Sequence, residues 1–257
     1  MRTEDTALIP ADFPQTGLLM PRPPRVPVTR FQVLGERSSG TNFVKRLLGR
    51  NSSLRPTEDL GWKHGFPHAT AIPADLAVIC MVRRADTWAL SMHAKPWHTT
   101  PAMQALDFPS FIRAPWHTVI DRPRYFPGAE AAGLVGLPLQ HDRNPLTGDV
   151  FPNLFALRRA KLHCLLSYLR RDCTAILLCM ETAQAAPEAT VDALLTGLGQ
   201  PPRQSAFAPV HKRLGSKFLP AIENRPPTPK SMGAPGLAFL RRQLDLKLEA
   251  ALGYTYD

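Results

Sequence analysis

The sequence predicts an α/β protein, a three-layer α/β/α arrangement around a central parallel sheet. Short apolar runs without alternation are typical of parallel strands covered on both faces. Amphipathic stretches of helical period stand between these runs. The chain has 257 residues, 44% of them hydrophobic, so it is long enough to bury a sizeable core, and this composition excludes disordered and collagen-like classes.

Clusters of proline divide the chain. The 27 prolines concentrate in residues 1–29, 96–152 and 201–235, whereas the stretches between them carry periodic signals. We therefore expect a Pro-rich N-terminal arm at 1–29 and a single α/β domain at 30–257. Within that domain, a long insertion is expected at about 95–152. No internal repeat is visible.

The first block of elements follows the arm. Phe31 to Leu34 reads as a short strand, residues 35–41 as a turn and residues 42 to about 49 as a helix. A second short strand is expected at 60–64. The seven-residue apolar run from Leu76 to Val82 predicts a central parallel strand. Asp86 is a natural N-cap for the helix that follows, through about residue 93.

The second block begins after the insertion. A helix is predicted from about 153 to 171, a buried strand at 175–180 and another helix at 188–198. The leucines between 237 and 252 predict one closing helix. Strands that alternate with helices favour right-handed crossovers, with ligands at the carboxyl ends of the strands.

Charge and cysteine content narrow the function classes. The net charge of +10 favours anionic partners, which include nucleic acid, an acidic membrane face and a phosphorylated or sulfated small molecule. The first residues lack the order of a secretory signal, and no apolar run is long enough to span a bilayer, so we expect a cytoplasmic protein without a membrane span. No C-x-x-C pair occurs, and we expect reduced thiols rather than disulfides or a zinc site at the four cysteines, Cys80, Cys164, Cys173 and Cys179.

The turn between the first strand and helix carries the most information. Gly35 and Gly40 frame a G-x-x-x-x-G-T sequence, which has the context of a loop that wraps an anion with backbone amides. A nucleoside-triphosphate enzyme would need Lys and then Ser or Thr after the second glycine, where this chain has Thr41 and Asn42. This argues for an anion that needs no metal. The alternative is a tight polar turn without a ligand, although seven basic residues between 22 and 50 face only one acid, Glu36.

Several segments, in order, resemble motifs of the sulfotransferases that use 3′-phosphoadenosine 5′-phosphosulfate (PAPS). Residues 38–41, Ser-Ser-Gly-Thr, look like the K/R-S-G-T loop of that family, and residues 62–67, Trp-Lys-His-Gly-Phe-Pro, look like its strand end with the catalytic histidine. Arg83 and Ser91 are similar to its motif for the 3′-phosphate. Residues 180–191 and 246–254 resemble its late strand–helix segment and terminal helix.

This resemblance implies a P-loop-containing, sulfotransferase-like fold and a role for each matching residue. His64 would be the catalytic base, and Lys63 and Arg37 would balance the charge of the leaving phosphate. Arg83 and Ser91 would hold the 3′-phosphate. The remaining co-substrate contacts would come from Arg37, Ser38, Ser39, Gly40, Thr41, Asn42, Lys212 and Arg213. The product would be 3′,5′-bisphosphoadenosine (PAP), no metal would be required, and the acceptor would be a small molecule or saccharide with a hydroxyl or amine.

Departures from the family pattern leave alternatives open. Ser38 stands where the family has Lys or Arg, so the cation that replaces it is undecided, and Lys212-Arg213 only approximates the family's late R-K-G segment. The rival bases are His68, His93 and His98. The rival functions are a divergent P-loop kinase, a nucleotide- or nucleic-acid-binding protein and a catalytically silent relative. The sequence lacks an aromatic and basic strand signature, which argues against nucleic acid. The insertion would form an acceptor pocket or lid, or merely cover a sheet edge.

Overall fold

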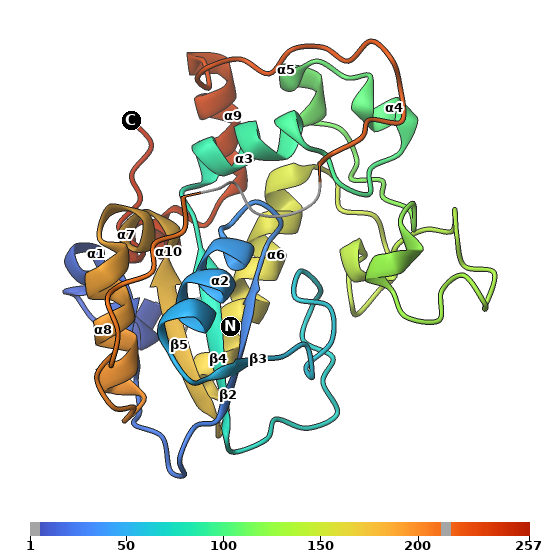
Figure 1. Ribbon diagram of the computed structural model, residues 1–257. Coiled ribbons are helices and arrows are strands. Elements are labelled where there is room, and N and C mark those ends of the chain that lie inside the picture. The colour runs from blue at the N-terminus through green and yellow to red at the C-terminus, as the bar shows by residue number, and fades with distance from the viewer. Residues whose placement is uncertain (1–5, 212–216) are drawn as a thin grey trace. The chain divides into compact units, whose positions relative to one another are not determined.

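The computed structural model describes residues 6–211 and 217–257 (Figure 1). Packing divides the chain into two compact units. The first comprises Met1–Arg83, Leu162–Gly215 and Leu246–Thr255, and the second comprises Arg84–Lys161, Ser216–Asp245 and Tyr256–Asp257. The single domain expected at 30–257 stays a prediction, because compactness does not test whether the units fold independently.

Within the described residues, the first unit holds one five-stranded sheet in the order β1-β5-β4-β2-β3. Its strands are β1 (Leu18–Leu19), β2 (Arg30–Gly35), β3 (Arg55–Pro56), β4 (Leu76–Val82) and β5 (Thr174–Cys179). Strands β2 to β5 run parallel, whereas β1 pairs antiparallel with β5. The sheet is therefore mixed: the predicted parallel sheet is confirmed for β2 to β5 and not for the edge strand β1. The segment expected as an arm turns at Gly17 and supplies that edge strand, preceded by η1 (Thr6–Leu8) and α1 (Phe13–Thr16).

Helices cover both faces of this sheet, as the three-layer prediction requires. On one face, α2 (Thr41–Asn51) and α8 (Pro187–Gly197) pack their buried leucines and valines against β2, β4 and β5 (Figure 1). Complete burial of one such side chain contributes about 1.5–3 kcal/mol. On the other face, the Cys80 thiol contacts the Leu165 carbonyl at the end of α6 (Leu154–Leu166), and Cys179 contacts the Leu252 carbonyl after α10 (Leu246–Ala251). In chain order, η4 (Ser167–Arg170) follows α6, and α7 (Met180–Ala185) follows β5.

Three further predictions about the elements differ from the structure. The strand expected at 60–64 is a pair of turns, closed by bonds from Gly61 to Glu58 and from Gly65 to Trp62, and pairing with β2 occurs earlier, at β3. Asp86 lies in the first turn of α3 (Ala85–Ala94), where Arg84 is the N-cap residue. The closing helix is two helices, α9 (Ala234–Gln243) and α10, because the chain becomes extended at Leu244.

The second unit contains the predicted insertion. Its helices are short: α4 (Pro101–Gln104), α5 (Phe108–Phe111), η2 (Pro123–Tyr125) and η3 (Gln140–Asp142), beside α3, α9 and the first turns of α6. Trp88, Trp116 and Phe111 are completely buried. The buried Lys161 ammonium pairs with Asp142 at 2.5 Å, so this irregular segment encloses a core of its own.

Two further expectations concern membrane-spanning segments and the state of the cysteines. No helix among the described residues is long and apolar enough to cross a membrane. The four cysteines are free thiols, and burial raises the pKa of the Cys179 thiol to about 12. A thiol with so high a pKa carries almost no reactive thiolate at neutral pH.

Candidate functional site

The loop between β2 and α2 is a tight turn with two residues in the left-handed region. Ser38 adopts a φ of +64° and Gly40 a φ of +90°, so the backbone reverses twice within a few residues. The amide and hydroxyl of Ser39 both donate to the Glu36 carbonyl, at 3.1 and 2.7 Å. A Cβ atom on Gly35 would lie 2.8 Å from the Met81 carbonyl oxygen, so only glycine fits there. Gly40 begins α2 without a side-chain cap, and the first amides of the helix point out of its N-terminus.

The side chains of the loop differ in exposure. Ser39 and Thr41 are buried, Ser38 is half-buried, and Asn42 is exposed in the first turn of α2. Arg37 is only 4% exposed, and its guanidinium carbon lies 5.7 Å from the centre of the Trp62 ring. Arg37 is therefore held in the packing beside Trp62 instead of extending from the loop.

Lys63 and His64 are fixed against the end of β2 by a single residue. The Gly35 amide donates to the Lys63 carbonyl at 3.0 Å, and the Gly35 carbonyl lies 2.6 Å from His64 Nδ1. A carbonyl oxygen only accepts, so Nδ1 carries the proton and the lone pair of the neutral ring is on Nε2. This is the tautomer that a proton acceptor at Nε2 requires.

Lys63 places a positive charge at the N-terminus of α2. Its ammonium donates to Asn42 Oδ1 at 2.6 Å. Burial lowers the pKa of Lys63; Glu58 opposes this shift and Lys45 adds to it. Glu58 is itself paired with Lys45 at 2.5 Å. A half-buried cation at the positive end of a helix dipole is unfavourable by itself, and a bound anion would relieve both effects.

Arg83 joins the loop from the neighbouring strand. It follows β4 directly and its guanidinium donates to the Ser38 carbonyl at 2.8 Å. Since β2 and β4 are adjacent and parallel, their carboxyl ends lie together at the edge of the sheet where ligands bind in open α/β folds. Arg83 thus supports the backbone reversal at Ser38.

The structure brings most of the predicted site residues together, namely Arg37, Ser38, Ser39, Gly40, Thr41, Asn42, Lys63, His64 and Arg83. Ser91 belongs to the second unit, where it is half-buried on α3 and its carbonyl accepts a bond from the Lys95 amide. Lys212 and Arg213 lie outside the described residues.

The rival histidines have different surroundings. His68, in the first unit, is exposed, and its Nδ1 lies 2.6 Å from the Phe66 carbonyl. His93 and His98 are in the second unit and almost completely buried, His93 between Thr228 and the Leu106 carbonyl and His98 beside Asp121. Of the four histidines, His64 is the one whose ring is bonded to the end of β2.

Comparison with known proteins adds no assignment. No family model, curated protein or solved structure matches the chain.

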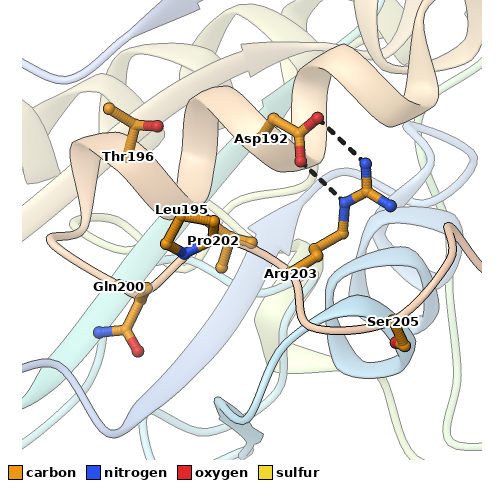
Figure 2. Close-up of a pocket in the computed structure, with 7 residues that line it drawn as sticks. All are labelled: Asp192, Leu195, Thr196, Gln200, Pro202, Arg203 and Ser205. Atoms are coloured by element: carbon orange, nitrogen blue, oxygen red, sulfur yellow. Dashed lines mark hydrogen bonds and ion pairs between the residues drawn. The ribbon is translucent and has the colours of Figure 1, made fainter.

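The first unit also has a hollow beside the end of α8 (Figure 2), lined by Asp192, Leu195, Thr196, Gln200, Pro202, Arg203 and Ser205. Arg203 is paired there with Asp192 at 2.8 Å and with Glu188 at 2.6 Å, so the charge of its guanidinium is already balanced. Within residues 6–211 and 217–257, no group of three or more His, Cys, Asp or Glu side chains could hold a metal ion. With the charge of Arg203 balanced, this hollow is a weaker candidate for an anion site than the loop after β2.

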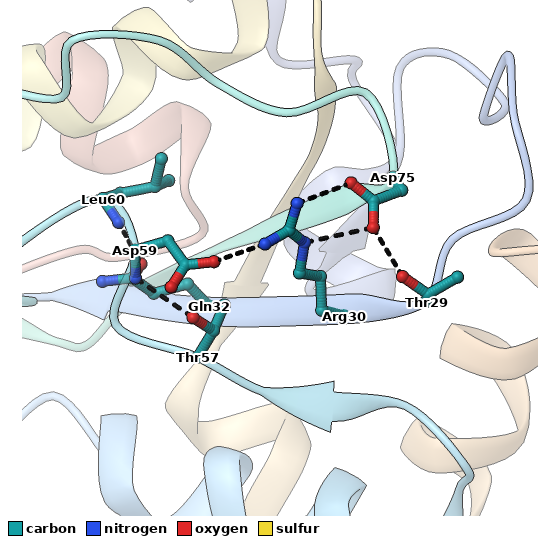
Figure 3. A network of polar contacts seen from close by, with 7 residues as sticks. All are labelled: Thr29, Arg30, Gln32, Thr57, Asp59, Leu60 and Asp75. Atoms are coloured by element: carbon teal, nitrogen blue, oxygen red, sulfur yellow. Dashed lines mark hydrogen bonds and ion pairs between the residues drawn. The ribbon is translucent and has the colours of Figure 1, made fainter.

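The sequence motifs did not indicate Gln32, which lies in a polar network along β2 (Figure 3). In that network, Arg30 bridges Asp59 and Asp75, while the buried side chain of Gln32 bonds the backbone at Leu60 and Gly61. A single polar residue within the apolar run 31–34 was the signal available in the sequence.

Proposed function

We propose that this chain is a PAPS-dependent sulfotransferase that moves a sulfuryl group to an acceptor hydroxyl or amine. One observation carries the proposal: His64, in the tautomer of a base, and Lys63 are both hydrogen-bonded to the end of the strand that opens the anion-binding turn. We expect the acceptor to be a small molecule or saccharide, and the location to be cytoplasmic.

The donors at this site fit the charged groups of PAPS. The first amides of α2 and the Thr41 hydroxyl would hold the 5′-phosphosulfate. Arg83, at the end of the adjacent strand, would reach the 3′-phosphate with a guanidinium that can form several bonds. Lys63 is the best candidate for the cation absent at Ser38, because its ammonium bonds Asn42 in the first turn of α2, whereas Arg37 is packed beside Trp62.

The proposed reaction is an in-line displacement at sulfur. His64 Nε2 accepts the proton of the acceptor group while the acceptor atom forms its bond to sulfur. The bond between sulfur and the bridging oxygen of the 5′-phosphate breaks, and PAP departs with that oxygen. Lys63 and the helix amides stabilise the charge that grows on this oxygen. Positioning and electrostatics supply most of the acceleration, as in phosphoryl transfer through a loose transition state.

Thermal unfolding with added nucleotide tests the proposal first. We expect PAP to raise the melting temperature more than AMP does, because only PAP carries the 3′-phosphate. Turnover of PAPS with a panel of hydroxyl and amine acceptors then follows. Stabilisation by ATP with Mg²⁺ alone would favour a kinase, and no stabilisation by any nucleotide would overturn the proposal.

Substitution of His64 tests the assignment of the base. His64→Ala should abolish turnover while PAP still binds, since the imidazole acts on the acceptor and not on the nucleotide. His68→Ala is the matched control, because His68 follows in the same loop and is exposed. A loss of PAP affinity of about tenfold, or roughly 1.4 kcal/mol, in His64→Ala would contradict this role.

A further inference from the structure

The segment that carries Lys63 and His64 comes after β3 in the chain and runs alongside β2 without forming a strand. Its two ends are held by main-chain bonds, from the Thr57 amide to the Phe31 carbonyl at 2.9 Å and from the Gly35 amide to the Lys63 carbonyl at 3.0 Å. Between these bonds the chain makes a turn, closed by the Gly61 amide and the Glu58 carbonyl. Something other than strand pairing must hold the middle of the segment in place.

The side chain of Gln32 supplies that attachment. Its Nε2 donates to the Gly61 carbonyl at 2.8 Å, and its Oε1 accepts the Leu60 amide at 2.7 Å (Figure 3). The side-chain amide thus takes the place of a backbone amide of a neighbouring strand. Gln32 is only 1% exposed, so these two bonds are made where water cannot replace them.

A glutamine is unusual at this buried position of a strand. The next residues of β2 on either side, Phe31 and Val33, are apolar and buried, as expected for a central strand. A buried side-chain amide costs free energy unless both of its ends are bonded. Both ends of Gln32 are bonded, and both bonds go to the one segment that leads to Lys63 and His64.

We infer that Gln32 is a positioning residue for the site. Its two bonds fix Leu60 and Gly61, and only Trp62 separates Gly61 from Lys63. The bond from His64 Nδ1 to the Gly35 carbonyl and the bond from Lys63 to Asn42 both depend on where this short segment leaves Gly61. The catalytic part of this inference rests on the proposed sulfotransferase activity, whereas the placement of the His64 ring does not.

The test compares Gln32→Leu with a matched control in the second unit. Gln104 is also buried and makes the same pair of backbone bonds, donating to the Thr99 carbonyl at 3.0 Å and accepting the Ala221 amide at 2.8 Å. Gln104→Leu therefore removes equivalent bonds far from Lys63 and His64 in the sequence. Gln32→Glu, which keeps the acceptor for Leu60 but not the donor for Gly61, serves if Gln32→Leu does not fold.

The ring nitrogen chemical shifts of His64, measured by NMR at a pH where the imidazole is neutral, are the primary readout. We expect the wild type and Gln104→Leu to show the proton on Nδ1, and the Gln32 variants to show a mixture of the two tautomers. If a folded Gln32 variant retains the wild-type shifts of His64, the inference is overturned.

Kinetics provide the second readout. With an acceptor in hand, we expect kcat of the Gln32 variants to fall by about tenfold or more, with little change in the KM for PAPS, because a misplaced base affects the transfer step most. An equal loss of kcat in Gln104→Leu would show a general effect of destabilisation and would overturn the inference. If the wild type turns over no PAPS, the proposed function fails, and the NMR comparison still decides whether Gln32 places the His64 ring.

Discussion

Single residues set the electrostatics of this site, and Lys63 shows how. Its ammonium is partly removed from water, which lowers its pKa, and its hydrogen bond goes to the neutral amide of Asn42. A carboxylate in that place would cancel the charge, whereas an amide orients the ammonium and leaves the charge available to a ligand. The charge of Lys63 is therefore incompletely compensated, which is the property that the proposed anion site needs.

Arg83 should contribute directly to the affinity for the 3′-phosphate. We expect Arg83→Ala to weaken PAP binding by roughly 1.5–3 kcal/mol, the range for a hydrogen bond to a charged group. AMP is the control ligand, because it lacks the 3′-phosphate and should lose much less affinity. Isothermal titration of both ligands measures the difference, and equal losses would mean that Arg83 acts only by supporting the Ser38 carbonyl.

Asp75 should make the stability of the protein depend on pH. Hydrogen bonds from Arg30 and Thr29 lower the pKa of its carboxyl from 3.8 to about 2. Because the folded pKa is below the unfolded one, this contribution is present above the unfolded pKa and is lost as the pH falls through the folded pKa. We expect Asp75→Asn to melt below the wild type at neutral pH, with a gap that closes as the pH approaches about 2.

The control for this pH dependence is Asp172→Asn. The ion pair between Asp172 and Arg25 is largely exposed, with 72% of each side chain accessible. Exposed pairs contribute little to stability, so this variant should melt close to the wild type throughout. A constant gap for Asp75→Asn across the pH range would refute the assigned cause.

At the scale of elements, the glycine that precedes α2 and the glycine within it have opposite requirements. Gly40 has a φ of +90°, and a Cβ there would lie 3.0 Å from Met180 Cγ, whereas Gly49 is helical and its nearest neighbour would be 3.9 Å away. We expect Gly40→Ala to destabilise the protein by about 1–2 kcal/mol and Gly49→Ala to stabilise it by about 0.5–1 kcal/mol. Urea unfolding of both variants tests this, and shifts of the same sign would contradict it.

The elements that the sequence predicted well are those with a strong local signal. The run from Leu76 to Val82 coincides with β4, because a strand covered on both faces favours apolar residues at successive positions. Strand β1 was missed since two residues carry no periodicity, and its pairing with β5 depends on a distant segment. The leucine stripe at 237–252 is regular in sequence, yet the extended backbone at Leu244 breaks it into two helices.

The site was predictable as a set of residue types and less so as a geometry. The glycines at 35 and 40, with Lys63 and His64, are the residues from which the sequence predicts an anion loop and a base, and both roles stay predictions. The tautomer of His64 could not be foreseen, because it is set by the carbonyl of Gly35. The role of Gln32 was hidden for the same reason, since its partners are backbone groups that every residue possesses.

At the scale of the whole molecule, the excess of positive charge should draw anionic ligands to the site. The net charge is +10, and added salt screens such fields over about 8 Å at 0.15 M. We expect the Kd of PAP to rise with sodium chloride more steeply than that of AMP, because PAP carries the larger negative charge. Adenosine, which is uncharged, should show almost no dependence, and equal slopes for PAP and AMP would count against electrostatic recognition.

The pairing of Leu18 with Leu178 also has a consequence for how the chain reaches its native state. It closes the longest loop of any pairing in the sheet, and the entropy lost on closing a loop grows with its length. Strand β1 should therefore dock after the transition state for folding, so that changes at Leu18 accelerate unfolding and leave the folding rate almost unaltered. Until it docks, the outer edge of β5 is unpaired, so we expect partly folded chains without β1 to aggregate more readily than the native protein.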